Sequence, residues 1–297
     1  MKRDLLSVLD AKDDLVEILK LAEKLKGRKT SQLRNRTLAL VFEKPSLRTR
    51  VSFEVAMSQL GGNAIYLSSQ DIRLGERESI KDVAQNLSRW VDGIAVRTFS
   101  HSTTLKLAKY ASIPVINALD DLEHPCQIIA DLLTIKEKKK KFKGLKLAWV
   151  GDGNNVCNSL ILGCALVGIE MSIATPKGYE PNREILKRAR DLGTAKIELA
   201  ETPQQAVKNA DIVYTDTWVS MGMEAEREIR EKVFRPYQVN SQLLAHAKKD
   251  YIVMHCLPAH RGYEITDEVI DGKHSIILKQ AENRLHAQKA ILLKLLR

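Results

Sequence analysis

The sequence predicts an α/β protein built from two doubly wound parallel-sheet domains, and three observations support this prediction. Short β-prone runs alternate with amphipathic helical segments along almost the whole chain. The alternation stops once, at the lysine-rich segment 136–146 (KEKKKKFKGLK), and then restarts. A chain of 297 residues with 44% hydrophobic content is also long enough for about two domains. We therefore expect domains at 1–138 and 144–279.

The first half of the chain begins with a charged amphipathic helix, after which strands and helices alternate. We expect strands at 37–42, 64–67, 93–97 and 113–117, and helices at 47–60, 79–91, 102–110 and 126–138. Each helix separates two strands, which is the connection that parallel pairing requires.

The second half repeats this rhythm. We expect strands at 145–150, 169–174, 195–199, 211–215 and 251–255, and helices at 155–167, 181–192, 203–209 and near 280–297. The segment 216–236 is predicted to be a long irregular loop, and such loops are often functional.

Composition argues against several classes of protein. The amino-terminal segment is charged, and no apolar run approaches the roughly 20 residues that span a bilayer, so we expect a cytoplasmic protein that does not contact a membrane. The four cysteines form no C-x-x-C pair, which argues against a disulfide framework or a zinc ribbon. The net charge of +10 fits a polyanionic partner or a small phosphorylated substrate. Aromatic residues make up only 5% and no nucleic-acid-binding motif is present, so we expect the small substrate and no nucleic acid.

The stretch FEKPSLRTRVSFE (42–54) lies at a predicted junction between a strand and a helix. Ser46 is well placed as the helix N-cap. The backbone N–H groups of Leu47, Arg48 and Thr49 then have no intrahelical partners. Those donors, the helix dipole and two guanidinium groups together describe an anion site. A plain cap with two solvated arginines explains the stretch about equally well when it is considered alone.

Two further motifs place polar groups at predicted helix starts. In HPCQ, proline suits the first helical position, so His124 falls at the N-cap and Gln127 in the first turn. A helix N-terminus lowers the pKa of a nearby histidine and favours a neutral ring that donates a hydrogen bond, although a capping histidine on a surface loop is the alternative.

In WVGDGNNV, Val156 breaks the G-x-G-x-x-G pattern, so we reject dinucleotide binding. The glycine turn still exposes the amides of Asn154 and Asn155 at the end of a strand, where α/β sheets bind ligands.

The motifs DTWVSMG and HCLP each follow a predicted strand in the second half. Asp216 could hold an ammonium group, and a plain turn aspartate is the alternative. His255 and Cys256 are adjacent in a predicted strand, so their side chains should point to opposite faces. This geometry argues against one metal ion bound by both residues, and we expect no metal and no cofactor.

Four motifs in this order, FEKPSLRTR, HPCQ, DTWVSMG and HCLP, resemble those of the carbamoyltransferase family, and the last two resemble its ornithine branch. The resemblance covers nearly the whole chain. It implies a carbamoyl-phosphate-binding domain and an ornithine-binding domain with the active site in the cleft between them. It also implies that the last helix, 280–297, packs back on the first domain, and that the chain forms a homotrimer or a multiple of it.

The resemblance implies roles for individual residues, which we carry over position by position. Carbamoyl phosphate would contact Ser46, Leu47, Arg48, Thr49, Arg97, His124, Gln127, Cys256, Leu257 and Arg284. L-Ornithine would contact Asn155, Asp216, Ser220 and Met221. Cys256, Arg48 and His124 would be the catalytic residues. Many members have Thr where Leu47 stands, which is a small loss if the contact there is made by the backbone N–H. Many members also have Gln where Arg73 stands, so we leave Arg73 out of the site.

The reaction that the resemblance implies is attack of the ornithine δ-amine on the carbamoyl carbon, which gives L-citrulline and phosphate. Charge develops on the carbonyl oxygen and the departing phosphate, where fixed donors such as Arg48, Arg97 and His124 would act. The δ-amine, with an ordinary pKa of about 10.4, must first become neutral. Cys256 and the departing phosphate are both candidate proton acceptors.

Two other functions compete with this hypothesis. One is a catalytically silent relative that binds carbamoyl phosphate as a regulatory subunit, and the other is a basic nucleic-acid binder. The first is disfavoured because the chain keeps residues for both substrates, and the second rests on charge alone.

Overall fold

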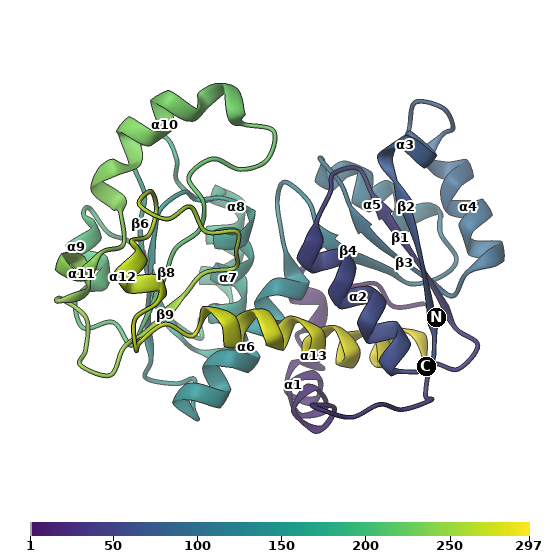
Figure 1. Cartoon of the computed structure of the whole chain (residues 1–297), viewed down its shortest axis with the longest axis horizontal. Helices are drawn as coiled ribbons and strands as arrows, with labels where there is room; N and C mark the ends of the chain where they lie inside the picture. Colours follow the sequence, from purple (N-terminus) through teal and green to yellow (C-terminus); the bar gives the residue numbers. More distant parts are fainter. Residues whose placement is uncertain (1) are drawn as a thin grey trace. The chain divides into compact units, whose positions relative to one another are not determined.

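The computed structural model describes residues 2–297, which form two compact units (Figure 1). Unit 1 comprises the chain up to Leu133 together with Glu282–Arg297, and unit 2 comprises Thr134–Ala281. Each unit contains one sheet, and its strands all pair in parallel. The predicted fold class of two parallel-sheet α/β domains is confirmed.

Unit 1 contains a four-stranded sheet in the order β2-β1-β3-β4. Its strands are β1 (Thr37–Phe42), β2 (Asn63–Ser68), β3 (Gly93–Arg97) and β4 (Val115–Leu119). Its helices are α1 (Leu15–Lys24), α2 (Leu47–Gln59), α3 (Ser69–Ile72), α4 (Ile80–Trp90) and α5 (His101–Tyr110), and a short 3-10 helix covers Val8–Ala11. Strand β3 is buried at every position, as expected for a central parallel strand covered on both faces. Phe42 pairs with Arg97, so the carboxyl ends of β1 and β3 lie side by side.

Unit 2 contains a five-stranded sheet in the order β7-β6-β5-β8-β9. Its strands are β5 (Lys146–Val150), β6 (Glu170–Ala174), β7 (Ile197–Leu199), β8 (Ile212–Tyr214) and β9 (Ile252–Met254). Its helices are α7 (Asn155–Val167), α8 (Arg183–Asp191), α9 (Pro203–Val207), α10 (Arg227–Phe234), α11 (Ser241–Leu244) and α12 (Asp267–Ile270), with 3-10 turns at Glu224–Glu226 and Arg235–Tyr237. The strand order runs outward in one direction from β5 to β7 and in the other from β8 to β9. Such a reversal point is where open α/β sheets bind ligands at the carboxyl ends of their strands.

Two long helices, α6 (Pro125–Lys139) and α13 (Ile277–Leu296), contain the boundaries between the units. Residues up to Leu133 of α6 and from Glu282 of α13 belong to unit 1. Neither these helices nor any other described helix is long and apolar enough to cross a membrane.

Two sequence predictions need correction. The segment 216–236 is not irregular throughout, because Arg227–Phe234 forms α10. This helix buries only Arg230 and Phe234, so its sequence lacks the broad apolar stripe that would have indicated it. The last strand ends at Met254 rather than at 255, which leaves His255 and Cys256 outside the regular ladder.

Candidate active site

The carboxyl ends of β1 and β3 bring two predicted site segments of unit 1 together. The segment that follows β1 carries Glu43, whose backbone N–H donates to the carbonyl of Arg97 over 2.8 Å. The Glu43 carboxylate in turn accepts a hydrogen bond of 2.7 Å from the backbone N–H of Phe99. These two bonds fix the chain that leads into α2 against the end of β3, where Arg97 lies buried.

The first turn of α2 has the capped geometry that the sequence predicts. The Ser46 hydroxyl accepts a hydrogen bond of 3.3 Å from the backbone N–H of Thr49, so Ser46 is the N-cap. The first intrahelical bond joins the N–H of Arg50 to the Ser46 carbonyl, and the N–H groups of Leu47 and Arg48 precede it. The Leu47 side chain is 74% exposed, so this residue offers the site its backbone rather than its side chain. A capped, donor-rich helix start of this kind favours an anion.

Arg284 connects two other predicted residues within unit 1. Its Nη2 donates to the Thr49 hydroxyl over 3.1 Å, and its Nη1 donates to the side-chain oxygen of Gln127. The Gln127 amide then donates to Asp131 over 2.8 Å. Arg284, Thr49 and Gln127 are all at least nine-tenths buried, so residues from three distant motifs form one rigid cluster.

The electrostatics of this cluster keep His124 neutral. Burial of the ring, followed by the positive charges around it, holds the pKa of His124 well below its ordinary value. The charged groups are Arg284, Arg97, Lys44 and Arg48. This direction agrees with the predicted neutral ring, and burial is its main cause. Four cations around a neutral ring describe a site for a strongly negative ligand. An oxygen atom of such a ligand could accept a hydrogen bond from the His124 ring.

Lys44 belongs to this cluster, and sequence reasoning missed it. Its side chain is buried, and burial together with the charge of Arg97 lowers its pKa. The signal was its position inside the motif FEKPSLRTR, one residue before Pro45.

In unit 2 the neighbouring strands β5, β8 and β9 deliver the candidate residues to one edge of the sheet. Asp216 follows β8, and its two carboxylate oxygens have separate partners. Oδ1 accepts a hydrogen bond of 3.1 Å from the Cys256 thiol, and Oδ2 accepts one of 2.8 Å from the Asn154 amide. Asp216 is 5% exposed while Cys256 is only partly buried. The structure therefore places two residues that the sequence predicted 40 positions apart in direct contact.

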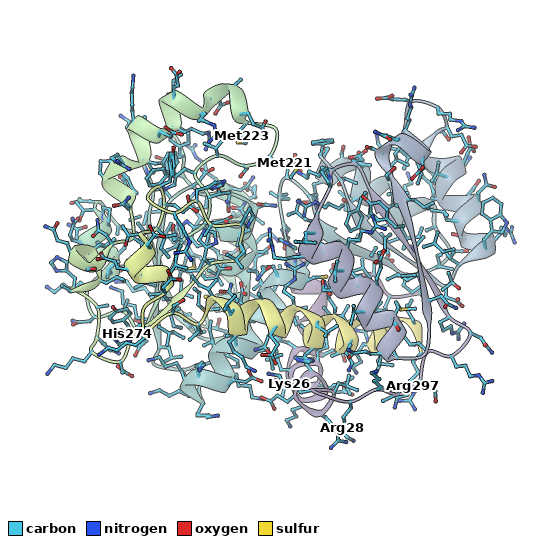
Figure 2. All side chains as sticks on the ribbon, viewed as in Figure 1. Lys26, Arg28, Met221, Met223, His274 and Arg297 are labelled. Atoms are coloured by element: carbon cyan, nitrogen blue, oxygen red, sulfur yellow. The ribbon has the colours of Figure 1, made fainter. Side chains whose placement is uncertain are left out.

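Asn154, which the sequence placed at this edge through its backbone amide, contacts Asp216 through its side chain, whereas other predicted residues lie outside this contact. Asn154 caps α7 through its side-chain oxygen, which leaves its amide free to reach Asp216. Asn155 is the first residue of α7. Met221 lies on the partly exposed loop that leads towards α10 (Figure 2), and Ser220 precedes it in the chain. Among residues 2–297 no hydrogen bond joins the side chain of either residue to Asp216.

The predicted opposite orientation of His255 and Cys256 is wrong. Ligand atoms of Asp216, His255 and Cys256 all lie within 4.8 Å of one another, because the strand ends before His255 and the alternation of side chains ends with it. Both ring nitrogens of His255 are nevertheless engaged. Nδ1 accepts a hydrogen bond of 2.8 Å from the N–H of Leu257, and Nε2 lies 3.1 Å from the buried Glu264 carboxylate. A metal ion bound here would have to displace one of these bonds.

Arg230 of α10 holds the loop after Asp216 in place. Its Nη1 donates to the Asp152 carboxylate over 2.9 Å and to the Trp218 carbonyl over 3.0 Å, while its Nε donates to Glu226. Burial raises the pKa of Asp152 to about 6, and the charge of Arg230 opposes that rise. This network joins the glycine turn to the DTWVSMG segment, and no sequence pattern indicated it because α10 was not predicted.

Comparison with known protein families shows which family the chain belongs to. The carbamoyl-phosphate-binding domain model of the aspartate/ornithine carbamoyltransferases matches residues 3–137, and the model of their aspartate/ornithine-binding domain matches residues 143–295. The chain belongs to the aspartate/ornithine carbamoyltransferase family.

Relatives within the family are similar over their full length. An ornithine carbamoyltransferase of Archaeoglobus fulgidus is 60% identical over 99% of this chain and 97% of the relative, and one of Methanosarcina acetivorans is 57% identical over the whole of both. The structure of the ornithine carbamoyltransferase of Pyrococcus furiosus has a TM-score of 0.96 and 51% identity, covering 99% of this chain and 97% of that one.

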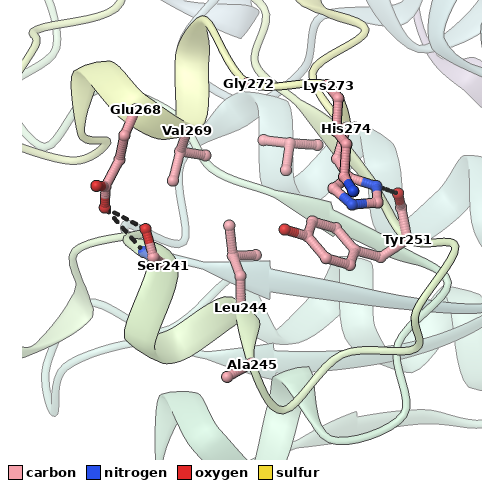
Figure 3. A pocket seen from close by; sticks show the side chains of 10 residues that line it. Ser241, Leu244, Ala245, Tyr251, Glu268, Val269, Gly272, Lys273 and His274 are labelled. Atoms are coloured by element: carbon pink, nitrogen blue, oxygen red, sulfur yellow. Dashed lines mark hydrogen bonds between the residues drawn. The ribbon is translucent and has the colours of Figure 1, made fainter.

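A pocket of about 320 Å³ in this family member is separate from the candidate site (Figure 3). Tyr251, which precedes β9, lines it together with residues of α11 and α12. Asp216 and Cys256 follow the carboxyl ends of their strands instead. The pocket therefore lies at the amino end of β9, away from the predicted residues.

Proposed function

We propose that the protein transfers the carbamoyl group of carbamoyl phosphate to the δ-amine of L-ornithine, giving L-citrulline and phosphate. The observation that carries this proposal is the set of four cations around a neutral His124 in unit 1, of which Arg97, Lys44 and Arg48 lie in the region that matches the carbamoyl-phosphate-binding model. The relatives at 60% and 57% identity carry the name ornithine carbamoyltransferase.

Unit 1 would bind carbamoyl phosphate. The backbone donors at the start of α2 and the guanidinium groups would hold the phosphate, and His124 would donate to the carbamoyl oxygen. Arg284 already donates to Thr49 and Gln127, so the groups around the ligand are ordered before it binds. The proposed contacts are Ser46, Leu47, Arg48, Thr49, Arg97, His124, Gln127 and Arg284.

Unit 2 would bind L-ornithine. Asp216 offers a buried carboxylate to an ammonium group, and its partners Cys256 and Asn154 fix the directions of its oxygens. Asn155, Ser220 and Met221 would complete the contacts, with Leu257 next to the reacting centre.

The chemical step transfers one proton as well as the carbamoyl group. The δ-nitrogen lone pair forms the new N–C bond, the bond between carbamoyl carbon and phosphate oxygen breaks, and phosphate leaves with the electron pair. The Cys256 thiol donates its hydrogen to Asp216, so it is itself protonated in this arrangement. We therefore assign the proton of the attacking amine to the departing phosphate, and we assign Cys256 to orientation of the amine. Arg48 and His124 would stabilise the charge that develops on the phosphate and on the carbonyl oxygen.

We further propose that copies of the chain assemble through unit 1 into a homotrimer or a multiple of it. Apolar side chains of α2 recur at every fourth position on an exposed face, and Ile65 of the edge strand β2 is also exposed. Exposed apolar groups of this kind mark interaction surfaces. All four cysteines are free thiols, which fits the reducing cytoplasm as the location.

The test is citrulline formation from carbamoyl phosphate and L-ornithine, with Arg48→Ala as the variant and with L-aspartate and putrescine as competing acceptors. We expect turnover that depends on ornithine and is lost in the variant. Binding of carbamoyl phosphate without turnover would instead indicate a regulatory subunit, and turnover with L-aspartate or putrescine in place of ornithine would overturn the proposed acceptor.

A further inference from the structure

The outer edge of β9 is completed by two different kinds of partner. β9 is the last strand of its sheet, so one of its edges has no neighbouring named strand. Along that edge the N–H of Val253 donates to the His274 carbonyl over 2.8 Å, and the N–H of Ile276 donates to the Val253 carbonyl over 3.0 Å. Residues 274–276 therefore act as a short additional strand. It ends there because α13 begins at Ile277.

The next backbone donor on the same edge belongs to His255, two residues after Val253. Gln280 supplies the missing acceptor, because its Oε1 accepts the His255 N–H over 2.9 Å. Its Nε2 donates to the Tyr214 hydroxyl over 2.8 Å. Gln280 has no exposed surface. The Tyr214 ring stacks on the Trp149 ring, with 5.2 Å between the ring centroids. One helical side chain thus continues the ladder after the neighbouring chain has turned away.

We propose that Gln280 is a positioning residue that sets the place of Cys256 at the candidate active site. It fixes the backbone on the amino side of Cys256, and the His255 ring fixes the other side by accepting the N–H of Leu257. Cys256 is held between two bonded N–H groups, with its Sγ 3.1 Å from Asp216. This proposal rests on the proposed function for its consequence in catalysis, but its structural part can be tested without substrate.

The consequence follows from the sensitivity of reaction geometry to small displacements. Loss of the Gln280 bond would free the His255 N–H and allow the 255–257 segment to shift. A displacement of about 1 Å at a reacting centre can lower a rate by about 100-fold. Such a shift would also separate the Cys256 thiol from the Asp216 carboxylate, whose negative charge disfavours the thiolate.

The experiment measures alkylation of Cys256 by iodoacetamide, followed by mass spectrometry, in Gln280→Met, Gln280→Glu and Tyr214→Phe. Cys256 is the suitable probe because the other three cysteines are buried. We expect alkylation about fivefold faster or more in Gln280→Met, because the thiol leaves the carboxylate. Gln280→Glu retains the acceptor for the His255 N–H, so it should stay within about twofold of the unmodified protein. Tyr214→Phe keeps that acceptor but removes the hydroxyl that accepts a hydrogen bond from the Gln280 amide. Its alkylation rate should therefore lie between those of Gln280→Glu and Gln280→Met.

Gln288→Met is the matched control. Gln288 lies on the same helix, is fully buried, and neither atom of its side-chain amide has a hydrogen-bond partner among the described residues. It lies in unit 1, so its replacement should leave Cys256 alkylation unchanged even where it alters the thermal midpoint. This comparison separates positioning of Cys256 from a general loss of stability in α13.

Kinetics then connect the position of Cys256 to the proposed reaction. We expect kcat/KM for ornithine to fall about tenfold or more in Gln280→Met, while phosphate binding measured by calorimetry stays unchanged. Unaltered alkylation in a folded Gln280→Met variant would overturn the proposal, as would a Gln280→Glu variant that behaves like Gln280→Met. Absence of citrulline formation in the unmodified protein would overturn the proposed function instead, and the alkylation result would still decide the role of Gln280.

Discussion

At the scale of single residues, charge and burial explain most of the candidate site. His124 is buried beside cations, and these two conditions act in the same direction on its ring. Asp216 is buried beside neutral donors, and it stays available for a positive ligand. One unit therefore presents excess positive charge and the other a buried carboxylate, which suits one anionic and one cationic substrate.

The neutral state of His124 makes stability depend on pH. Its pKa is lower in the folded than in the unfolded chain, so the unfolded chain binds more protons below about pH 6.5. The stability that the folded chain gains from a neutral His124 ring is therefore complete above about pH 6.5. It declines as the pH falls, by up to about 1.4 kcal/mol per pH unit. We expect the difference in urea-unfolding free energy between the unmodified protein and His124→Gln to shrink between pH 7.5 and 5.5, measured without phosphate. A difference that is constant across this range would mean that the folded ring takes up its proton normally.

The Asp216 carboxylate supports a prediction on substrate affinity. Asp216→Asn keeps the shape and the bond from Asn154 but removes the negative charge. A hydrogen bond to a charged group contributes about 1.5–3 kcal/mol, so KM for ornithine should rise about 10- to 100-fold. Initial-rate kinetics at saturating carbamoyl phosphate would measure this, with phosphate binding as the control that should not change. A KM within about twofold of the unmodified value would exclude Asp216 as the ammonium partner.

At the scale of elements, the sequence predicted those with a strong hydrophobic pattern and missed those fixed by long-range contacts. The observed β1 and β3 have the predicted bounds, because both are apolar runs limited by turns. α10 was missed because two buried residues make no detectable stripe. The same reasoning applies to the site. Ser46 and His124 could be found from helix starts, whereas the side-chain contacts of Asn154 and Gln280 are made to residues 62 and 25 positions away.

The glycine turn after β5 offers a test at this scale. A Cβ on Gly153 would lie 2.3 Å from the backbone nitrogen of Pro181 and 2.6 Å from the Tyr179 carbonyl oxygen. Both are backbone atoms, so relieving these contacts would require a costly shift of the chain. Gly153→Ala should therefore destabilise unit 2 by about 2–4 kcal/mol and displace Asn154. Gly178→Ala is the control, because its Cβ meets nothing within 4 Å and only its positive φ of 89° costs stability, about 1 kcal/mol. Equal urea midpoints for the two variants would show that the turn relaxes around the added methyl group.

At the scale of the whole molecule, the two units divide the proposed chemistry between them. Unit 1 carries the cationic cluster and unit 2 carries Asp216 and Cys256. Two helices, α6 and α13, contribute residues to both units. Arg284 and Gln280 lie four positions apart in α13, so this single element supplies a residue of the proposed phosphate site to one unit and the proposed positioning residue to the other.

An exposed apolar face of α2 and β2 predicts that copies of the chain assemble into oligomers. Leu47, Val51 and Val55 are 74%, 46% and 36% exposed at every fourth position of α2, and Ile65 of β2 is 48% exposed. Burying this surface against another copy would remove apolar area from water, whereas a charge placed there would have to be desolvated. We expect size-exclusion chromatography with light scattering to show an oligomer for the unmodified protein and smaller species for the double variant Val51→Glu with Ile65→Lys.

The control for this prediction is Leu278→Glu, which changes a side chain that is 81% exposed in unit 2. Its oligomeric state should match that of the unmodified protein, because the proposed contact lies in unit 1 alone. Leu47 is left intact since its backbone belongs to the candidate phosphate site. A monomeric unmodified protein at micromolar concentration, or a double variant that assembles as well as Leu278→Glu, would show that this face of α2 and β2 does not hold the copies together.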